Sequence, residues 1–259
     1  VEISNRNGET ITEADQAQFL TSINKWLDKD VRHQVLELEH ADAYPHEMVE
    51  QMKDMGLFGA TISQHYGGMG LPSQTYAKIV TTISEVWMSL TGIFNSHLIM
   101  SAAVERFGTE EQKSRLLPRM ARGELRGGLA LTEPDCGTDL QAIRTRAVRD
   151  GDDYVINGTK TWISNGLEGN CVALLVKTDT EIEPRHRGMS LFFAEKGPGF
   201  SASRKLKKLG YKGIDSAELM FDDYRISPDN LIGGKEGEGF LQTMGGLELG
   251  RINVAARGV

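Results

Sequence analysis

The stretch LALTEPDCGTDL, residues 129–140, lies where the character of the sequence changes. Its apolar start is typical of the end of a strand, and Pro134 and Gly137 then make the chain turn. Residues 10–125 contain only three prolines, and their apolar residues recur at helical spacing. The residues after the stretch form short β-prone segments separated by turn residues. We therefore expect a helical region followed by a strand-rich region, with the boundary near residue 126.

The first 125 residues predict five or six helices joined by short turns, which together form an all-α unit. Two apolar stripes at helical spacing lie within residues 19–31 and 48–57. Residues 75–87 and 90–107 are longer and more apolar, which is typical of buried helices. Thr109 is a good N-cap for one more helix, because two acids follow it in the first turn.

Residues 126–234 predict a small β-barrel or sandwich built from short strands. The pair Asp150-Gly151 lies between two β-prone segments, which is a strong hairpin signal. Four further strand-like segments follow: KTWIS at 160–164, CVALLVKT at 171–178, GMSLFFAEK at 188–196 and SAELMFDDYRI at 216–226. Strands and helices do not alternate at a spacing of ~30 residues, so a Rossmann sheet is disfavoured.

Residues 235–259 predict the first helix of a second helical unit. Apolar residues again share one helix face: Leu241, Met244, Ile252, Ala255 and Val259. An amphipathic helix gains most of its stability from packing, and no partner helix follows this one. We therefore expect the chain to be a fragment or a truncated form of a longer protein. The expected fold class is α+β, with divisions at 1–125, 126–234 and 235–259.

The composition is that of an ordinary globular protein, with 39% hydrophobic and 25% charged residues. The net charge of −7 argues against non-specific binding of nucleic acid. No apolar run approaches the ~20 residues that span a bilayer, and the first residues lack the features of a signal peptide. Cys136 and Cys171 provide no disulfide framework and fit a reducing compartment. We expect neither a nucleic-acid partner nor a membrane partner.

The cysteine and the acids of the opening stretch do not favour reactive chemistry. Cys136 lies beside Asp135 and Asp139, and neighbouring acids raise the pKa of a thiol rather than lower it. These acids and Glu133 lack the ligand alternation of a calcium loop. The single Glu-x-x-His at 37–40 is not enough for a di-iron bundle, which needs two such elements. We expect no metal site.

The same loop has the features of a cofactor cradle. Its turn leaves backbone N–H groups outside any strand ladder, and Thr132 and Thr138 add hydroxyls. Trp162 precedes Ser164 by two residues, so on a regular strand both side chains share one face. An aromatic side chain beside a hydroxyl suits an isoalloxazine ring. The alternative is that Trp162 is a core residue, as buried tryptophans commonly are.

Two segments, LTEPDCGTD at 131–139 and NGTKTWISNG at 157–166, resemble the acyl-CoA dehydrogenase family. The resemblance extends over the whole chain through three more segments: FGTEEQKSRLLPRMARGE at 107–124, KKLGYKGIDSAELMFDDYRISPDNLIGGKEGEGF at 207–240 and LELGRINVAARGV at 247–259. It implies an N-terminal helical domain, a middle β-barrel domain and a C-terminal four-helix bundle, with FAD between barrel and bundle. Only the first helix of that bundle is expected in this chain.

The resemblance also implies a set of site residues. Those expected to bind FAD are Leu129, Leu131, Thr132, Gly137, Thr138, Trp162 and Ser164. Those expected to meet the substrate are Thr138, Phe94, His97, Ser216 and Arg251. Phe94, Asn95 and His97 lie on the helix that would line the acyl pocket, and the alternative for His97 is a core histidine. Lys212 stands where many members have an arginine, which puts a bidentate contact there in doubt.

The implied reaction is the α,β-dehydrogenation of a short or branched acyl-CoA thioester, in fatty acid or amino acid catabolism. Electrons would pass to an electron-transferring flavoprotein, and the full-length protein would be a homotetramer or a dimer. The catalytic base is expected beyond Val259. A minority of the family places the base just before the arginine at 251, but Gly250 holds that position here and Glu248 would point elsewhere. This chain alone is therefore expected to lack its base.

Other activities of the same fold remain open. The loops could serve an acyl-CoA oxidase, a nitroalkane oxidase or a flavin monooxygenase, or a family member that binds DNA or has no catalytic activity. The net charge of −7, with RKLKK at 204–208 as the one basic cluster, argues against DNA binding. The expected location is the cytoplasm of a bacterium, or the mitochondrial matrix after processing.

Overall fold

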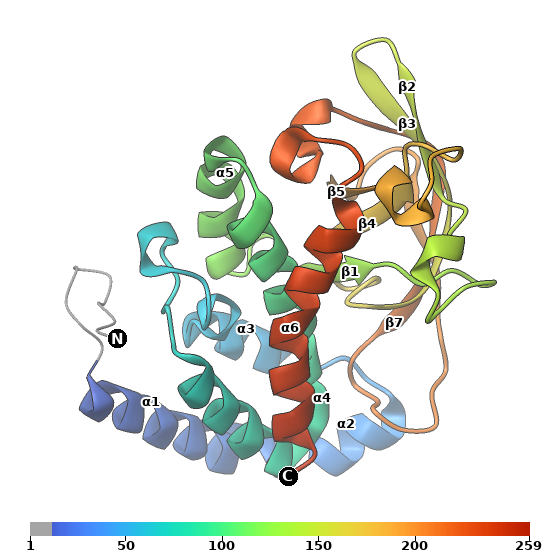
Figure 1. Cartoon of the computed structure of the whole chain (residues 1–259). Helices are drawn as coiled ribbons and strands as arrows, with labels where there is room; N and C mark the ends of the chain where they lie inside the picture. Colours follow the sequence, from blue (N-terminus) through green and yellow to red (C-terminus); the bar gives the residue numbers. More distant parts are fainter. Residues whose placement is uncertain (1–11) are drawn as a thin grey trace.

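The computed structural model of the chain describes residues 12–259. Its first half is helical (Figure 1). The helices are α1 (Glu13–Trp26), which continues into a π-helical turn (Leu27–Val31), α2 (Val35–Ala41), α3 (His46–Asp54), α4 (Ser73–Phe107) and α5 (Glu110–Ala121). None of the helices within residues 12–259 combines the length and apolar character needed to cross a bilayer.

Local signals in the sequence account for where these helices begin and break. Thr109 caps α5: its hydroxyl accepts from the backbone N–H of Gln112, and the Gln112 side chain accepts from the N–H of Thr109, which forms a capping box. The long helix α4 is interrupted at Trp87, whose φ of −155° and ψ of 103° are not helical. The two helices expected at 75–87 and 90–107 are therefore the two halves of α4.

A seven-stranded sheet follows the helices. The strands are β1 (Gly127–Ala130), β2 (Arg146–Asp150), β3 (Asp153–Ser164), β4 (Cys171–Lys177), β5 (Met189–Glu195), β6 (Phe200–Lys205) and β7 (Ser216–Ile226). Their order is β1-β4-β2-β3-β7-β6, with β5 paired to β4. Strand β1 is parallel to β4, whereas β2–β3, β3–β7, β4–β5 and β6–β7 are antiparallel. Gly151, at φ +64°, forms the turn of the expected β2–β3 hairpin.

The sheet curls into a half-barrel, so the expected α+β class is confirmed but the barrel is open. Strand β4 is buried on both faces because alternate residues enter two cores. Cys171, Ala173 and Leu175 pack against the helical region, whereas Val172 and Leu174 lie in the core of the half-barrel. The strand thus joins the two halves of the molecule through the alternation of its side chains.

The last helix, α6 (Gly239–Arg257), runs beside α4 and next to β5 (Figure 1). The face of α6 that is buried carries small and polar residues: Gly239, Gln242, Thr243, Gly246, Gly250, Asn253 and Ala256. Gly246 allows a close approach to α4, because a Cβ there would lie 3.0 Å from the carbonyl oxygen of Ile99. The apolar face expected from the sequence is left largely at the surface, with Leu241 66% exposed.

Candidate functional site

The loop after β1 is joined to β3 at an irregular point of that strand. The backbone groups of Glu133 and Cys136 exchange hydrogen bonds of 2.9 and 3.1 Å, which closes a turn around the two residues between them. The N–H of Thr161 donates to the carbonyl oxygen of Thr132 at 2.8 Å. Strand β3 has a bulge here, because its pairing with β7 shifts register between Lys160 and Ile163. The bulge therefore brings the loop beside Thr161 and its neighbour.

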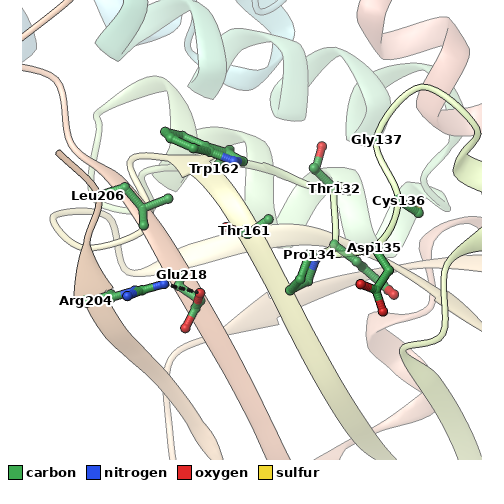
Figure 2. A pocket seen from close by; sticks show the side chains of 11 residues that line it. Thr132, Pro134, Asp135, Cys136, Gly137, Thr161, Trp162, Arg204, Leu206 and Glu218 are labelled. Carbon is green, nitrogen blue, oxygen red and sulfur yellow. Dashed lines mark hydrogen bonds and ion pairs between the residues drawn. The ribbon is translucent and has the colours of Figure 1, made fainter. Parts of the chain in front are cut away.

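That neighbour is Trp162, which adopts a strained and exposed position. Its φ is +59°, a left-handed value that bulky residues rarely adopt, and 57% of the residue is exposed. The indole lines a cavity of about 520 Å³ together with Thr132 and the 133–137 turn. Figure 2 shows Trp162 between Leu206 and Thr132, with Cys136 and Gly137 beyond Thr132 and with Arg204 and Glu218 below Trp162 in this view.

A buried ion pair between Lys160 and Glu133 fixes the loop after β1 to strand β3. The Nζ of Lys160 lies 2.8 Å from Oε1 of Glu133 and donates to the carbonyl oxygen of Leu131 at 3.0 Å. The Glu133 carboxylate also accepts from the backbone N–H groups of Arg144 and Thr145, at 2.6 and 3.0 Å. Lys160 is fully buried and Glu133 is 7% exposed. The pair ties the loop, β3 and the chain that enters β2 together at one point.

Burial and pairing act in opposite directions on these two groups. Burial lowers the pKa of Lys160 to about 8, and the attraction of Glu133 offsets only part of this shift. Burial also acts to raise the pKa of Glu133, but the Lys160 ammonium and the hydrogen bonds outweigh it and hold this pKa below its usual value. Glu133 is therefore an ionised structural carboxylate rather than an acid that exchanges protons with a ligand.

Several hydrogen-bonding groups of the loop have no protein partner. Among residues 12–259, the backbone N–H groups of Thr132, Gly137 and Thr138 donate to no protein acceptor. The hydroxyls of Thr132 and Ser164 likewise form no side-chain hydrogen bond within this range. A Cβ placed on Gly137 would meet nothing within 4 Å, so this part of the loop opens to solvent. Free donors beside an exposed indole fit a planar ligand that carries carbonyl oxygens.

Ser164 lies one step further along β3, where strands and helix α4 meet. It faces Ser216 in the β3–β7 register but does not line the cavity with Trp162, because the bulge breaks the alternation expected from the sequence. A Cβ placed on Gly128 of β1 would lie 2.9 Å from the Ser164 carbonyl oxygen and 3.2 Å from Cβ of Ser96 on α4. Ser216 is buried, and its hydroxyl accepts from Nζ of Lys208 at 3.3 Å.

A second hollow lies between α4 and α6. It has a volume of about 440 Å³ and is lined by Asn95, Ile99, Leu247, Gly250, Arg251, Val254 and Ala255. A Cβ on Gly250 would lie 2.5 Å from Cδ1 of Ile99, so the two helices are close at this point. Arg251 is exposed at the groove. Glu248 points away from it and forms a surface ion pair with Arg106, at 2.8 Å.

Phe94 and His97 are placed in the helical core rather than on this groove. Phe94 is fully buried, and its ring lies 6.3 Å from that of Tyr76 in an edge-on arrangement. Nε2 of His97 lies 3.1 Å from the carbonyl oxygen of Phe58, and the ring packs edge-on against the Phe58 ring. Burial lowers the pKa of His97 to about 3, so the imidazole is neutral. The geometry therefore supports the core alternative for His97.

Cys136 and the nearby acids do not form a reactive centre. Partial burial and the negative charge of Glu133 raise the pKa of the Cys136 thiol, which keeps it protonated. Within residues 12–259, no three His, Cys, Asp or Glu side chains gather closely enough to hold a metal ion. The loop offers hydrogen bonds and shape rather than a nucleophile.

Sequence reasoning overlooked three residues that support the site: Glu133, Lys160 and Asn165. Asn165 is buried at φ +58°, and its Nδ2 donates to the carbonyl oxygens of Ile93 and Gly127, at 2.8 and 3.0 Å. Asn-Gly directly after a strand was the available signal, because asparagine tolerates left-handed backbone. A lysine within an otherwise β-prone segment was the signal for Lys160.

Comparison with known proteins matches this architecture to one family. The model of the acyl-CoA dehydrogenase N-terminal domain matches residues 13–124, and that of the acyl-CoA dehydrogenase middle domain matches residues 128–224. The chain belongs to the acyl-CoA dehydrogenase family.

Individual relatives show the same relationship. The chain is 38% identical over 224 residues to (2S)-methylsuccinyl-CoA dehydrogenase of Cereibacter sphaeroides, which covers 83% of this chain and 41% of that protein. It is 36% identical over 237 residues to the short-chain specific acyl-CoA dehydrogenase of Clostridium acetobutylicum; the match covers 91% of this chain and 62% of that protein. The structure of butyryl-CoA dehydrogenase from Megasphaera elsdenii superposes with a TM-score of 0.89 at 30% identity. The superposition covers 95% of this chain and 65% of that structure. The chain spans between two fifths and two thirds of the length of these relatives.

Proposed function

We propose that the protein binds FAD and catalyses the α,β-dehydrogenation of an acyl-CoA thioester with a short or branched acyl group. Membership of the family supports the reaction class. The small acyl group follows relatives named for methylsuccinyl, short-chain and butyryl thioesters, while another relative is named long-chain specific. The observation that carries the proposal is Trp162, a half-exposed indole at a strained φ of +59° beside unpartnered donors. Strain and apolar exposure at one residue both cost stability and are typical of a ligand site.

The residues present fit a flavin. We assign its edge to the hydroxyl and N–H of Thr132 and to the backbone of Leu129 and Leu131, and one face of its ring to Trp162. Gly137 and Thr138 would supply further hydrogen bonds from the loop, and Ser164 would supply one from the end of β3, outside the cavity that Trp162 lines. FAD, when bound, would supply the acceptor for the hydride of the acyl β-carbon. Donors toward the carbonyl edge would stabilise negative charge there, which favours that transfer.

The groove between α4 and α6 is our candidate for the acyl group. Arg251 lies on this groove, and the CoA part would extend toward Ser216 on β7 and Thr138 in the loop after β1. No carboxylate of residues 12–259 lines the groove, since Glu248 pairs with Arg106 and Gly250 has no side chain. We therefore propose that the catalytic base is not among residues 12–259. The base would remove the α-proton once hydrogen bonds have polarised the thioester carbonyl.

The proposal includes two partners that the family relationship supports. An electron-transferring flavoprotein would take the electrons, and the full-length protein would assemble as a homotetramer or a dimer. An oxidase or monooxygenase would consume oxygen instead, which separates these alternatives experimentally. A bacterial cytoplasm or a mitochondrial matrix is the proposed location.

The experiment uses the full-length protein and its Thr132→Ala variant. We expect the variant to bind FAD about tenfold more weakly, because it loses the hydroxyl toward the flavin edge. Titration of the apoprotein with FAD, followed by fluorescence, measures this change. Thr180→Ala, in an exposed loop, is the matched control. Activity on a panel of acyl-CoA thioesters with a dye as electron acceptor tests the reaction itself. Failure to oxidise any of them would refute the proposed function.

A further inference from the structure

The groove between α4 and α6 contains one polar side chain that is almost fully buried. Asn95 is 6% exposed, whereas its neighbours on the groove, Ile99, Leu247 and Val254, are apolar. A buried amide lowers stability unless its polar atoms find partners. A fully hydrocarbon ligand would leave such an amide unsatisfied. The chemistry of the groove therefore depends on what Asn95 can bind.

A chain of buried hydrogen bonds fixes one end of this amide. Nδ2 of Asn253 on α6 donates to the Tyr76 hydroxyl at 2.8 Å, and this hydroxyl donates to Oδ1 of Asn95 at 3.4 Å. Asn253 and Tyr76 are both fully buried. Burial raises the pKa of Tyr76, so the phenol stays neutral and keeps its proton for this bond. The chain orients Asn95 from the side opposite the groove.

The other end of the amide is free for a ligand. Nδ2 of Asn95 has no acceptor among residues 12–259, and it is not among the fully enclosed unpartnered atoms of this range. It is therefore the part of the side chain that reaches the groove. Rotating the amide by 180° would exchange oxygen and nitrogen, but one polar atom would still face the groove. As the structure has it, this atom is a hydrogen-bond donor.

The helix that lines the groove contacts strands that carry candidate flavin residues. Ser96, the residue after Asn95 on α4, lies near Gly128 of β1 and the carbonyl oxygen of Ser164. Arg251 lines the same groove and forms no ion pair among residues 12–259, so an anionic group there would meet a cation. Both polar groups of the groove that face a ligand are therefore donors suited to an oxygen acceptor.

We propose that Asn95 is a specificity residue that favours acyl groups with an oxygen function beyond the β-carbon, a hydroxyl or a carboxylate, over plain alkyl chains. The inference rests on the proposed function, because it assigns the groove to the acyl group. The donor at Nδ2 is satisfied by such an oxygen and is left unpaired by a methyl terminus. A site that holds a buried hydrogen-bonding group discriminates strongly against a ligand that lacks the partner.

The test compares three thioesters of equal chain length on the full-length holoenzyme: pentanoyl-CoA, 5-hydroxypentanoyl-CoA and glutaryl-CoA. The ratio of kcat/KM for each oxygenated substrate to that for pentanoyl-CoA is one measurement. The second is the binding of the corresponding 2-enoyl products by calorimetry, which requires no turnover. We expect at least one oxygenated thioester to be favoured about tenfold in both measurements.

Variants connect this preference to the amide. Leucine has nearly the same shape as asparagine but no polar atoms in its side chain. We therefore expect Asn95→Leu to remove the tenfold preference and to raise kcat/KM for pentanoyl-CoA. Tyr76→Phe removes the bond that orients the amide, and we expect it to reduce the preference about threefold. Val254→Ala changes the apolar wall of the same groove. We expect it to change kcat/KM for all three substrates by a similar factor. Flavin absorbance and urea unfolding show whether each variant is folded.

The outcomes separate this inference from the proposed function. A preference for hydroxyl, carboxylate or both that Asn95→Leu removes supports the inference and identifies the acceptor. Oxidation of pentanoyl-CoA with no preference, or a preference that Asn95→Leu leaves intact, overturns the inference while the dehydrogenase function stands. If no acyl-CoA is bound or oxidised by the holoenzyme, both are overturned.

Discussion

At the scale of single residues, His97 gives the chain a pH dependence that arises from packing alone. The imidazole is fully buried against Phe58 and Ser101, and burial lowers its pKa from 6.5 to about 3. Between these two values the unfolded chain binds a proton that the folded chain does not. The free energy of unfolding therefore falls as the pH falls below 6.5, by up to about 1.4 kcal/mol per pH unit from this residue.

We expect His97→Gln to remove this contribution. The variant loses packing and is less stable than the wild type at pH 7, but the difference in unfolding free energy becomes smaller as the pH is lowered from 6.5 to 4. Urea unfolding at half-unit pH intervals measures the difference. His65→Gln, at an exposed position, is the control. If the unfolding free energies of wild type and His97→Gln depend on pH in the same way, His97 does not cause the loss of stability at low pH.

Individual site residues were predictable only in part. Thr132 and Trp162 were expected to lie together, and they do line one cavity. Trp162 and Ser164 were expected on one face of a regular strand, but the bulge at 161–162 changes the direction of the tryptophan. The Glu133–Lys160 pair joins residues far apart in sequence through the sheet register, which no local pattern contains. The sequence predicts which residue types can bind a ligand, but it does not predict where a strand is irregular or which strands pair.

At the scale of elements, Gln112 joins α5 to the segment that leads into α6. Its Nε2 donates to the carbonyl oxygens of Asp229 and Leu231, at 2.9 and 2.7 Å. Its Oε1 accepts from the N–H groups of Thr109 and Gly233, both at 3.0 Å. The side chain is 5% exposed, so water cannot easily replace these four bonds. One residue thus completes a helix cap and fixes the chain before the last helix.

We expect Gln112→Ala to lower the free energy of unfolding by about 3 kcal/mol, because it leaves several buried backbone groups without partners. Thr109→Ala removes the cap hydroxyl alone and should cost about 1 kcal/mol. Chemical unfolding of both variants beside the wild type measures the two effects. Equal losses would mean that the contacts with residues 229–233 contribute little beyond the cap.

Elements with strong local signals were predicted well. The capping residue Thr109, the Asp150-Gly151 hairpin and the separation of α4 into two halves are all visible in the sequence and present in the structure. Strand β6 was not predicted, because its exposed and buried residues do not alternate regularly. The break in α4 is held by a distant contact: the indole N–H of Trp87 donates to Glu39 on α2 at 2.6 Å. Sequence periodicity locates such a break but does not identify what stabilises it.

At the scale of the whole molecule, the helical region and the half-barrel form one structure through a few shared contacts. Strand β4 contributes side chains to both cores, and α6 lies between α4 and β5 (Figure 1). One candidate hollow is lined by the loop after β1 and by β3, the other by α4 and α6, and Gly128 of β1 lies close to both Ser164 of β3 and Ser96 of α4. Binding at both would therefore depend on how firmly these three elements are held together, which is the role of the Asn165 side chain.

Asn165 allows a matched test of this junction. Its Nδ2 donates to Ile93 on α4 and to Gly127 on β1, and its φ of +58° is a conformation that glycine adopts freely. We expect Asn165→Ala to lower the unfolding free energy by about 3 kcal/mol, from two lost hydrogen bonds and added backbone strain. Asn165→Gly loses the same bonds without the strain, so it should be about 1 kcal/mol more stable than the alanine variant.

Urea unfolding of the two Asn165 variants distinguishes the contributions of bonding and conformation. If the loss arises from the bonds, both variants are clearly less stable than the wild type, and amide hydrogen exchange rises in residues 127–130 and 93–97 in both. If Asn165→Gly is as stable as the wild type, the side-chain bonds do not hold the junction and only its backbone conformation matters. If the Asn165 hydrogen bonds hold the junction, both variants should also bind ligands more weakly at both hollows, because α4 and β1 would be free to separate.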